Sequence, residues 1–187
     1  MNKTIVRPAL IVCGVFGSGK TTVAKRISAL LGIPHVSTGA IFRQIADERG
    51  MTPLQLGIYY EEHPELDLEL DDRVLAEVAK GECIADGRVT AALARKRDLA
   101  ALTVRLVVEP AIGAARVAVR EGKPVALVLE ENRVRESDIA RRLKALYDVD
   151  AGDDGHYDLT IRTDDCPVEQ VVGRILDAAH PLGYPFP

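Results

Sequence analysis

A glycine-rich segment near the start of the chain restricts the fold more than any other feature. Residues 14–21 read GVFGSGKT and match the pattern G-x-x-x-x-G-K-[ST] at every fixed position. An apolar run at 9–13 precedes the segment, and residues 21–31 follow it with apolar side chains at helical spacing. A strand, a glycine turn and a helix in this order direct backbone N–H groups and the positive end of a helix toward one point. The segment therefore predicts a phosphate-binding loop.

The residues of this loop have distinct physical tasks. Its glycines let the backbone bend around phosphate oxygens with the N–H groups pointing inward. We expect the Lys20 ammonium to bridge the β- and γ-phosphates of a nucleoside triphosphate, and the Thr21 hydroxyl to ligate Mg²⁺. The expected donor-nucleotide contacts come from the loop and the first helical turn: Gly14, Gly17, Ser18, Gly19, Lys20, Thr21 and Thr22.

The rest of the chain alternates between strand-like and helix-like segments, which is typical of an α/β domain with a mainly parallel sheet. Further strands are expected at 35–37, 83–85, 102–108 and 158–162, and helices at about 38–49, 130–146 and 167–179. Additional helices are expected to open near residues 52–53, 63–64 and 110, whereas the proline-rich end after residue 179 is expected to be irregular. Since the chain shows neither internal repeats nor a linker, we expect one domain over residues 1–187.

Composition excludes several classes of function. The net charge of -4 argues against a general nucleic-acid binder, which usually carries a basic surface. No stretch approaches the roughly 18 apolar residues of a membrane helix, and the three cysteines lack the spacing of a metal site. We therefore expect a cytoplasmic protein with reduced thiols that acts on a small molecule, with neither nucleic acid nor membrane as a partner.

Arginines are concentrated in one late stretch of the sequence. Guanidinium groups stabilise the charge that develops during phosphoryl transfer, and a flap that carries them excludes water. The alternative is a solvated helix face with ion pairs at i,i+4, such as Glu131 with Arg135. No N-K-x-D sequence that reads guanine occurs, so a small-molecule kinase fits better than a GTPase switch. The stretch contains Arg116, Arg120, Arg133, Arg135, Arg141 and Arg142.

Three further polar residues follow predicted strands. Arg43 lies on the helix after the second strand, and Asp86 and Arg88 follow the third. The carboxyl ends of parallel strands converge on the ligand crevice of an open α/β sheet. We therefore expect both arginines to hold an acceptor phosphate and Asp86 to orient waters on Mg²⁺. The alternatives, which stay open here, are a surface Arg43, a structural Arg88 and an Asp86 that caps a turn.

These motifs together resemble the archaeal-type cytidylate kinases of the nucleoside monophosphate kinase superfamily, over residues 11 to about 179. The similarity includes the loop and its helix, the later R-E pair at 135–136, and Arg142 followed by YDVD at 147–150. The other matching segments are STGAIFR (37–43), EEHPELDLELDDR (61–73), DGR (86–88), RVAVREG (116–122) and YDLTIRT (157–163).

The resemblance implies the three-layer sandwich of the P-loop NTPases, with a five-stranded parallel sheet and helices on both faces. It also implies a helical acceptor-binding segment at about 38–80 and an arginine-rich lid at about 120–142. ATP and Mg²⁺ are the implied cofactors, and CMP or dCMP is the implied acceptor. The implied catalytic residues are Lys20, Arg116, Arg120, Arg135 and Arg142. The implied acceptor-binding residues are Ser37, Gly39, Arg43, Asp86, Gly87 and Arg88.

Departures from the family pattern leave the acceptor base open. They are Ala40, the lack of an aromatic residue just after Arg88, and the apolar run at 125–129. A monophosphate is already ionised at pH 7 and needs no general base, which agrees with the lack of an obvious one. Two alternatives remain. A kinase for a modified nucleotide or a hydroxyl-bearing metabolite would use Asp86 as its base, and a non-catalytic regulator would bind ATP without turnover.

Overall fold

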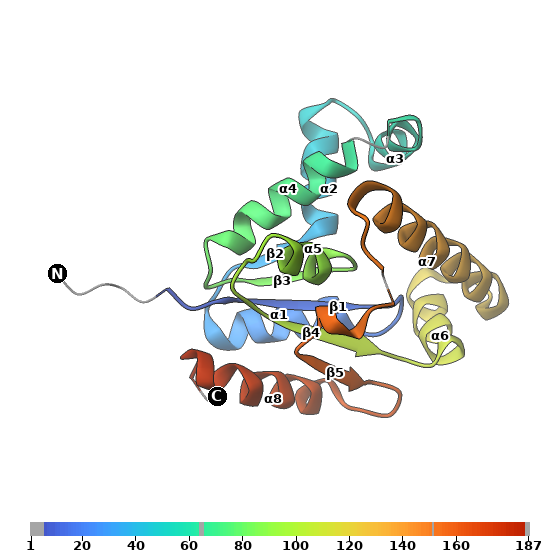
Figure 1. Ribbon diagram of the computed structural model, residues 1–187. Coiled ribbons are helices and arrows are strands. Elements are labelled where there is room, and N and C mark those ends of the chain that lie inside the picture. The colour runs from blue at the N-terminus through green and yellow to red at the C-terminus, as the bar shows by residue number, and fades with distance from the viewer. Residues whose placement is uncertain (1–5, 64–65, 151, 186–187) are drawn as a thin grey trace.

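The computed structural model describes residues 6–63, 66–150 and 152–185. Within them, five strands form one sheet in the order β2-β3-β1-β4-β5, and every neighbouring pair is parallel. The strands are β1 (Ala9–Gly14), β2 (His35–Ser37), β3 (Ile84–Gly87), β4 (Ala101–Val107) and β5 (Leu159–Arg162). All the carboxyl ends therefore meet at one edge of the sheet, on the right in Figure 1. The predicted five-stranded parallel sheet is confirmed.

The central strand shows why the apolar run at 9–13 becomes a strand covered on both faces. Its residues are fully buried, and successive side chains point to opposite faces. Leu10 and Val12 belong to one hydrophobic cluster, whereas Ile11 and Cys13 belong to the other. The apolar run thus supplies two hydrophobic cores at once.

Helices cover both faces of the sheet. α1 (Lys20–Leu31) and α8 (Val168–Ala179) pack on one face, where Ile27 and Ile175 are fully buried. α4 (Leu66–Ala79) and α5 (Thr90–Lys96) pack on the other face, through residues such as Leu93. Complete burial of one such aliphatic side chain stabilises the fold by about 1.5–3 kcal/mol. These helices make the outer layers of the sandwich.

Two helices extend beyond the β2 edge of the sheet. α2 (Thr38–Glu48) and α3 (Pro53–Glu62) pack with α4 around a separate hydrophobic cluster that includes Ile45 and Tyr60. α3 begins at a capping box in which Thr52 and Gln55 exchange hydrogen bonds. This part of the molecule has its own small core and projects above the sheet in Figure 1.

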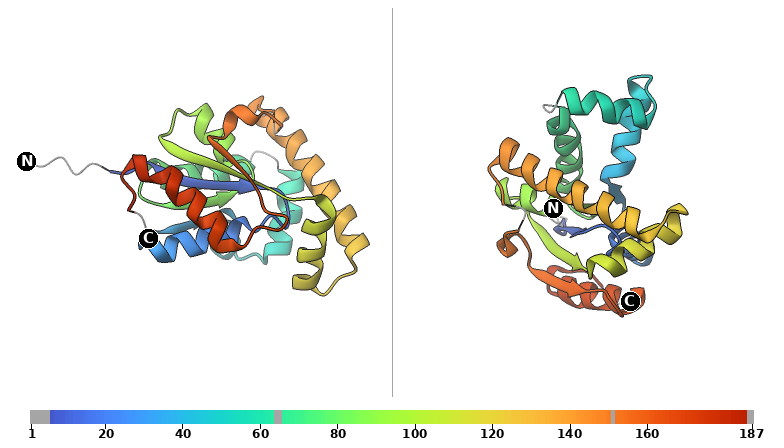
Figure 2. Two further views of the ribbon diagram at one scale, coloured as in Figure 1. Left: turned by 90° about the horizontal axis from the view of Figure 1, so that it is seen from below. Right: turned by 90° about the vertical axis from the view of Figure 1, so that its right-hand side faces the viewer.

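A helical hairpin lies at the carboxyl edge of the sheet. It consists of α6 (Pro110–Glu121) and α7 (Val125–Tyr147), which meet at Ala114, Val117 and Val128. Figure 2 shows α7 crossing in front of the strand ends. The element richest in arginine therefore lies over the edge where the phosphate-binding loop is found.

The structure corrects three local predictions. α7 begins at Val125 rather than at about residue 130, because Pro124 provides its N-cap with φ at -62°. The short helix α5 was not predicted. The predicted irregular tail is partly wrong for the described residues, since His180–Leu182 form a 3₁₀ turn and Tyr184 is only 1% exposed. The helix expected to open at residues 63–64 falls partly outside the described residues, and α4 begins at Leu66.

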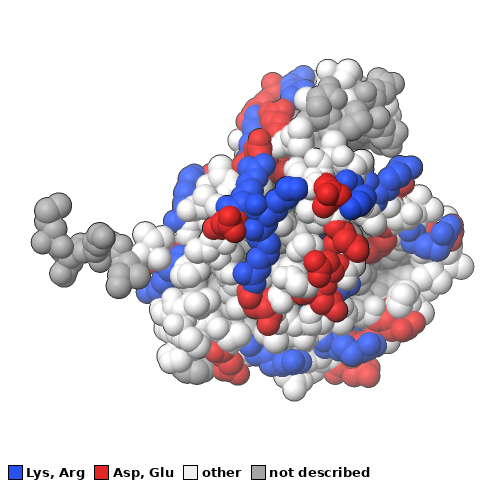
Figure 3. All heavy atoms as spheres, in the orientation of Figure 1, with Lys and Arg blue, Asp and Glu red and all other residues white. Residues whose placement is uncertain are grey.

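The surface carries both charge signs. On the face drawn in Figure 3, basic side chains lie beside acidic ones. Ion pairs between charged side chains of the surface include Arg97 with Asp72 at 2.5 Å. No helix formed by the described residues combines the length and apolar character needed to cross a membrane.

Candidate active site

The glycine loop has the strand–turn–helix setting that its sequence predicts. β1 ends at Gly14 and α1 begins at Lys20. Gly17 has φ at 75°, a left-handed conformation that favours glycine, and a Cβ at this position would collide with the backbone of Gly113 on α6. A Cβ on Gly14 would lie 2.5 Å from the Leu106 carbonyl oxygen. The loop thus needs glycine both for its turn and for close contact with its neighbours.

Lys20 carries a poorly solvated charge at this loop. Its ammonium donates to the Val15 carbonyl at 3.3 Å. The pKa of Lys20 is lowered to about 8, mainly by desolvation and then by the Arg88 guanidinium, whereas Asp86 opposes the shift. A buried ammonium with little hydration is stabilised when an anion joins it, so the loop favours the binding of an anionic group.

Thr21 and Asp86 lie side by side at the mouth of the loop. The Thr21 hydroxyl donates to one carboxylate oxygen of Asp86, which is only 4% exposed at the end of β3. Nε2 of His35 lies 3.2 Å from the other carboxylate oxygen, and the Thr38 hydroxyl donates to the Asp86 backbone carbonyl. A hydroxyl and a carboxylate are hard oxygen ligands of the kind that Mg²⁺ prefers.

Within the described parts of the chain, no three His, Cys, Asp or Glu side chains are grouped to hold a metal ion. Mg²⁺ usually keeps several waters and takes further ligands from substrate phosphates. The pair formed by Thr21 and Asp86 therefore fits a magnesium ion that arrives with a nucleotide better than a permanently bound one.

Three cationic side chains lie close to the ring of Phe16 in the loop. Its ring centre lies 4.3 Å from the Arg88 guanidinium, 5.5 Å from that of Arg135 and 5.7 Å from the Lys20 ammonium. The Phe16 backbone N–H donates to the Glu136 carboxylate at 3.0 Å. Because Arg135 and Glu136 both belong to α7, these contacts attach that helix to the loop.

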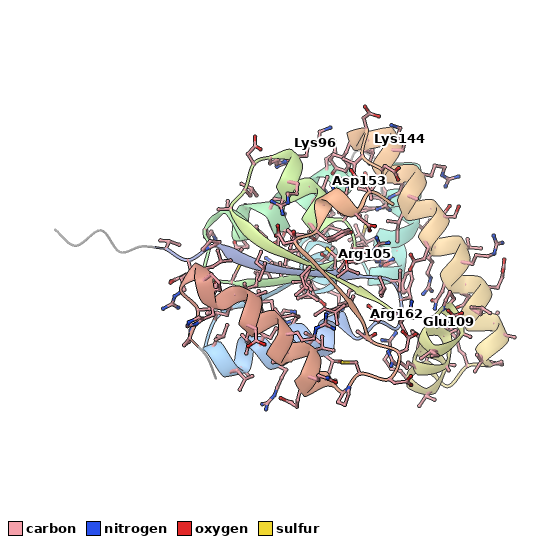
Figure 4. The ribbon with its side chains drawn as sticks, turned by 60° about the horizontal axis from the view of Figure 1, so that its bottom comes forward. Lys96, Arg105, Glu109, Lys144, Asp153 and Arg162 are labelled. Carbon is pink, nitrogen blue, oxygen red and sulfur yellow. The ribbon has the colours of Figure 1, made fainter. Side chains whose placement is uncertain are left out.

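Arg116 contacts the loop from the α6 side. Its guanidinium donates to the carbonyls of Thr163 at 2.6 Å and Asp164 at 2.8 Å, and lies 3.3 Å from that of Gly17. Figure 4 shows Glu109 and Arg162 at the same edge. The Glu109 N–H and the Arg162 guanidinium both donate to the Asp164 carboxylate. The segment after β5 is therefore held against the loop.

A cavity of about 70 Å³ lies beneath α7, next to the loop. Arg105, which is labelled in Figure 4, lines it from β4, pairs with Asp154 at 2.5 Å and lies over the Tyr157 ring. Ligand pockets usually measure roughly 300–1,000 Å³, so this cavity alone is too small to hold a nucleotide. The cavity is lined by Gly14, Val15, Arg88, Ala92, Arg105, Glu136, Ile139, Leu143 and Tyr157.

The remaining basic residues predicted for the site divide into two groups. Arg142 lies close enough to Arg88 to lower the pKa of that guanidinium, after the larger effect of desolvation. Arg120, by contrast, pairs with Glu121 at 2.9 Å and its side chain is 68% exposed. Arg43 is exposed on α2. The structure does not bring Arg120 and Arg43 against the loop as it brings Arg88.

The smaller acceptor-side residues lie at the ends of β2 and β3. Ser37 is opposite Asp86 in the sheet, and a Cβ on Gly87 would collide with the Thr90 hydroxyl. Gly39 lies in the first turn of α2, where an added Cβ would be 3.7 Å from the Arg43 guanidinium. These positions surround Asp86 at one end of the crevice.

Two other arginines of the late stretch follow the solvated-face interpretation. Arg133 pairs with Glu130 and Arg141 pairs with Asp138, each three residues away on α7. Such exposed pairs contribute little to stability. The arginine-rich stretch is thus partly an ordinary solvent-facing surface and partly a lining of the site.

Phe16, Glu136 and His35 lie at the site, and sequence reasoning missed all three. Phe16 occupies a variable position of the loop pattern. Glu136 is an acidic residue in a stretch assigned to the site for its arginines. His35 was predicted only as the first residue of a strand. The R-E pair at 135–136 was the one available signal for Glu136, because its arginine was already assigned to the site.

Known proteins resemble this chain over most of its length. The family model described as an AAA domain matches residues 13–143. A cytidylate kinase of Methanothermobacter thermautotrophicus is 39% identical over 155 residues, which are 82% of this chain and 94% of the relative. A cytidylate kinase of Archaeoglobus fulgidus is 36% identical over 171 residues, 90% of this chain and 93% of the relative.

Solved structures support the fold alone, because their sequence identities are low. An uncharacterized protein from Eubacterium ventriosum has a TM-score of 0.70 at 16% identity, covering 93% of this chain and 99% of its own. A shikimate kinase from Acinetobacter baumannii in complex with shikimate has a TM-score of 0.61 at 20% identity, covering 95% of each chain.

Proposed function

Because the chain belongs to the cytidylate kinase family, we propose that it transfers the γ-phosphoryl group of ATP to a nucleoside monophosphate, with CMP or dCMP as the acceptor. The observation that carries this proposal is the convergence of Lys20, Thr21, Asp86 and Arg88 at the mouth of the glycine loop. These groups offer a cation for a transferred phosphoryl group, oxygens for a metal and a guanidinium for a second phosphate.

On the donor side, the loop N–H groups and the start of α1 bind the phosphates of ATP. Lys20 meets the β- and γ-phosphates, which restore the full charge of its ammonium. Thr21 and Asp86 would hold Mg²⁺, which neutralises charge on the donor phosphates when bound. Ser18, whose hydroxyl donates to the Val15 carbonyl at 2.8 Å, maintains the curvature of the loop.

On the acceptor side, Arg88 binds the acceptor phosphate from the end of β3. Arg43 reaches the same phosphate from α2 when the segment at about 38–80 closes on it. The acceptor oxygen is already ionised, so bringing the two phosphates into line is the main task.

The lid at about 120–142 completes the site. Arg135 and Arg142 come from α7, and Arg116 and Arg120 come from α6. Arg120 reaches the phosphates only if it leaves its pair with Glu121. Closing of the hairpin excludes water, which would otherwise compete with the acceptor for the phosphoryl group.

The test is ADP formation from ATP and Mg²⁺ with CMP, dCMP, UMP, AMP, GMP, shikimate, gluconate or no acceptor. We expect turnover with CMP or dCMP, and a loss of at least about 100-fold in Lys20→Ala without a fall in the thermal midpoint. Lys25→Ala, which removes an exposed lysine from the same helix, is the matched control and keeps the wild-type rate.

Two outcomes would reject the proposal. ATP binding without ADP formation for any acceptor would identify a non-catalytic regulator. ADP formation only with hydroxyl acceptors such as shikimate or gluconate would identify a metabolite kinase in which Asp86 acts as the base. Phosphorylation of a modified nucleotide alone would keep the mechanism and replace the acceptor.

A further inference from the structure

Phe16 occupies a position that the loop pattern leaves free, yet it is the common neighbour of the three cations at the site. Arg88 lies 4.3 Å from its ring centre, Arg135 5.5 Å and Lys20 5.7 Å. The cations come from separate parts of the chain, namely the end of β3, the middle of α7 and the start of α1. No other side chain of the loop has such contacts among the interactions found in the described residues.

The gathering of three like charges has an electrostatic cost. Arg88 and Arg135 repel each other, and burial of Lys20 near Arg88 lowers the pKa of the lysine to about 8. An aromatic ring attracts cations to its face through its quadrupole, and the attraction grows when the cation is poorly hydrated. The ring of Phe16 therefore offsets part of this repulsion in the absence of phosphate.

A second contact fixes the position of the ring itself. The Phe16 N–H donates to Glu136, and the next residue along α7 toward the N-terminus, Arg135, lies over the ring. The backbone and the side chain of Phe16 thus both contact one turn of α7. These two contacts hold α7 against the loop in the nucleotide-free protein.

We propose that Phe16 is a positioning residue for phosphoryl transfer, whose ring face holds Lys20, Arg88 and Arg135 where they meet the transferred group. The proposal rests on the proposed function. Charge on the equatorial oxygens is redistributed in the transition state, and cations held in advance stabilise it without reorganisation. Loss of the ring face therefore lowers kcat more than it raises the KM for ATP.

The kinetic test compares Phe16→Leu and Phe16→Met, which keep an apolar side chain of similar size, with Phe16→Tyr, which keeps the ring face. We expect kcat to fall about tenfold in the first two variants and to stay within about twofold of wild type in the third. The KM for ATP stays within about threefold throughout. Equal loss in all three variants, or none in Phe16→Leu, would overturn the proposal.

A spectroscopic test does not depend on turnover. Protons of a guanidinium above a ring are shielded, so the side-chain NMR signals of Arg88 should be shifted upfield in the nucleotide-free protein. The shift should disappear in Phe16→Leu and persist in Phe16→Tyr, with Arg88→Lys identifying the signal. An unshifted wild-type signal would contradict the inference even if CMP is phosphorylated, and a shifted signal without kinase activity would reject only the proposed function and the kinetic role.

Discussion

At the scale of single residues, the site is an arrangement of partly compensated charges. Asp86 accepts from Thr21 and lies 3.2 Å from His35, whereas Lys20 is poorly solvated and lies near a second cation, Arg88. A charge that is poorly solvated in the free protein gains the most when its ligand arrives. Because desolvation disfavours the Lys20 ammonium in the free protein, we expect Lys20 to bind the phosphates.

The lowered pKa of Lys20 predicts a pH limit for the capture of ATP. The ammonium is protonated below about pH 8 and loses its charge above it, so kcat/KM for ATP should fall as pH rises through about 8. Bound phosphates raise the pKa again, so kcat should persist to higher pH. The same shift makes the contribution of Lys20 to the free energy of unfolding rise from pH 8 toward its ordinary pKa of 10.5.

Steady-state rates between pH 6 and 10 check this prediction. Lys20→Arg keeps a charge at every pH used, so the decline near pH 8 should be absent from its residual activity. The same decline in Lys20→Arg would assign the limit to another group.

At the scale of elements, α7 contributes to the site and to the solvent-facing surface at once. Its first turns contain the apolar run at 125–129, of which Val128 is fully buried and Leu127 is half-exposed. Farther along, Arg135 and Glu136 reach the loop, and Arg133 pairs outward with Glu130. The sequence predicts an arginine-rich helix here, but it does not indicate which of the arginines face the loop.

Glu136 gives this element a testable electrostatic role. Its carboxylate accepts from a loop N–H and stands near the place where we expect the anionic triphosphate. Glu136→Gln removes this like charge, so ATP should bind about fivefold more tightly. Asp138→Asn makes the same charge change at a half-exposed residue two positions away and should leave affinity unaltered.

Isothermal titration with ATP and Mg²⁺ measures both variants. Weaker ATP binding by Glu136→Gln would contradict this prediction. It would show that the Glu136 carboxylate keeps its hydrogen bond to the loop and stabilises the loop in the ATP complex.

At the scale of the whole molecule, the two ends of the described chain meet. Tyr184 is buried in the core that α1 and α8 form on the sheet, its hydroxyl donates to the Pro8 carbonyl at 2.7 Å, and Arg7 lies over its ring. The tail thus closes one end of the hydrophobic core beside β1, the strand that leads into the loop.

The contacts of Tyr184 indicate that the tail contributes to stability. Tyr184→Ala should lower the free energy of unfolding by about 3–5 kcal/mol, and Tyr184→Phe, which loses only the hydrogen bond, by about 1 kcal/mol. Chemical denaturation measures both values. A smaller loss in Tyr184→Ala than in Tyr184→Phe would mean that the ring is not packed in solution.

Features formed by residues that are close together in the sequence were predictable before the structure. The loop was predictable because its glycines, Lys20 and Thr21 are consecutive and lie between a strand and a helix, and the sheet because buried strands alternate with helices. Asp86 and Arg88 were predictable because parallel strands end at one edge.

Features formed by residues that are far apart in the sequence became visible only in the tertiary structure. Phe16 lies 120 residues from Glu136 along the chain, and no local pattern indicates that contact. The choice among the arginines follows from the angle at which α7 crosses the sheet edge. The burial of Tyr184 follows from the path of the tail back to β1. Packing geometry sets all three, because side chains of the same type become a site lining, a surface ion pair or a core residue according to which surface meets them.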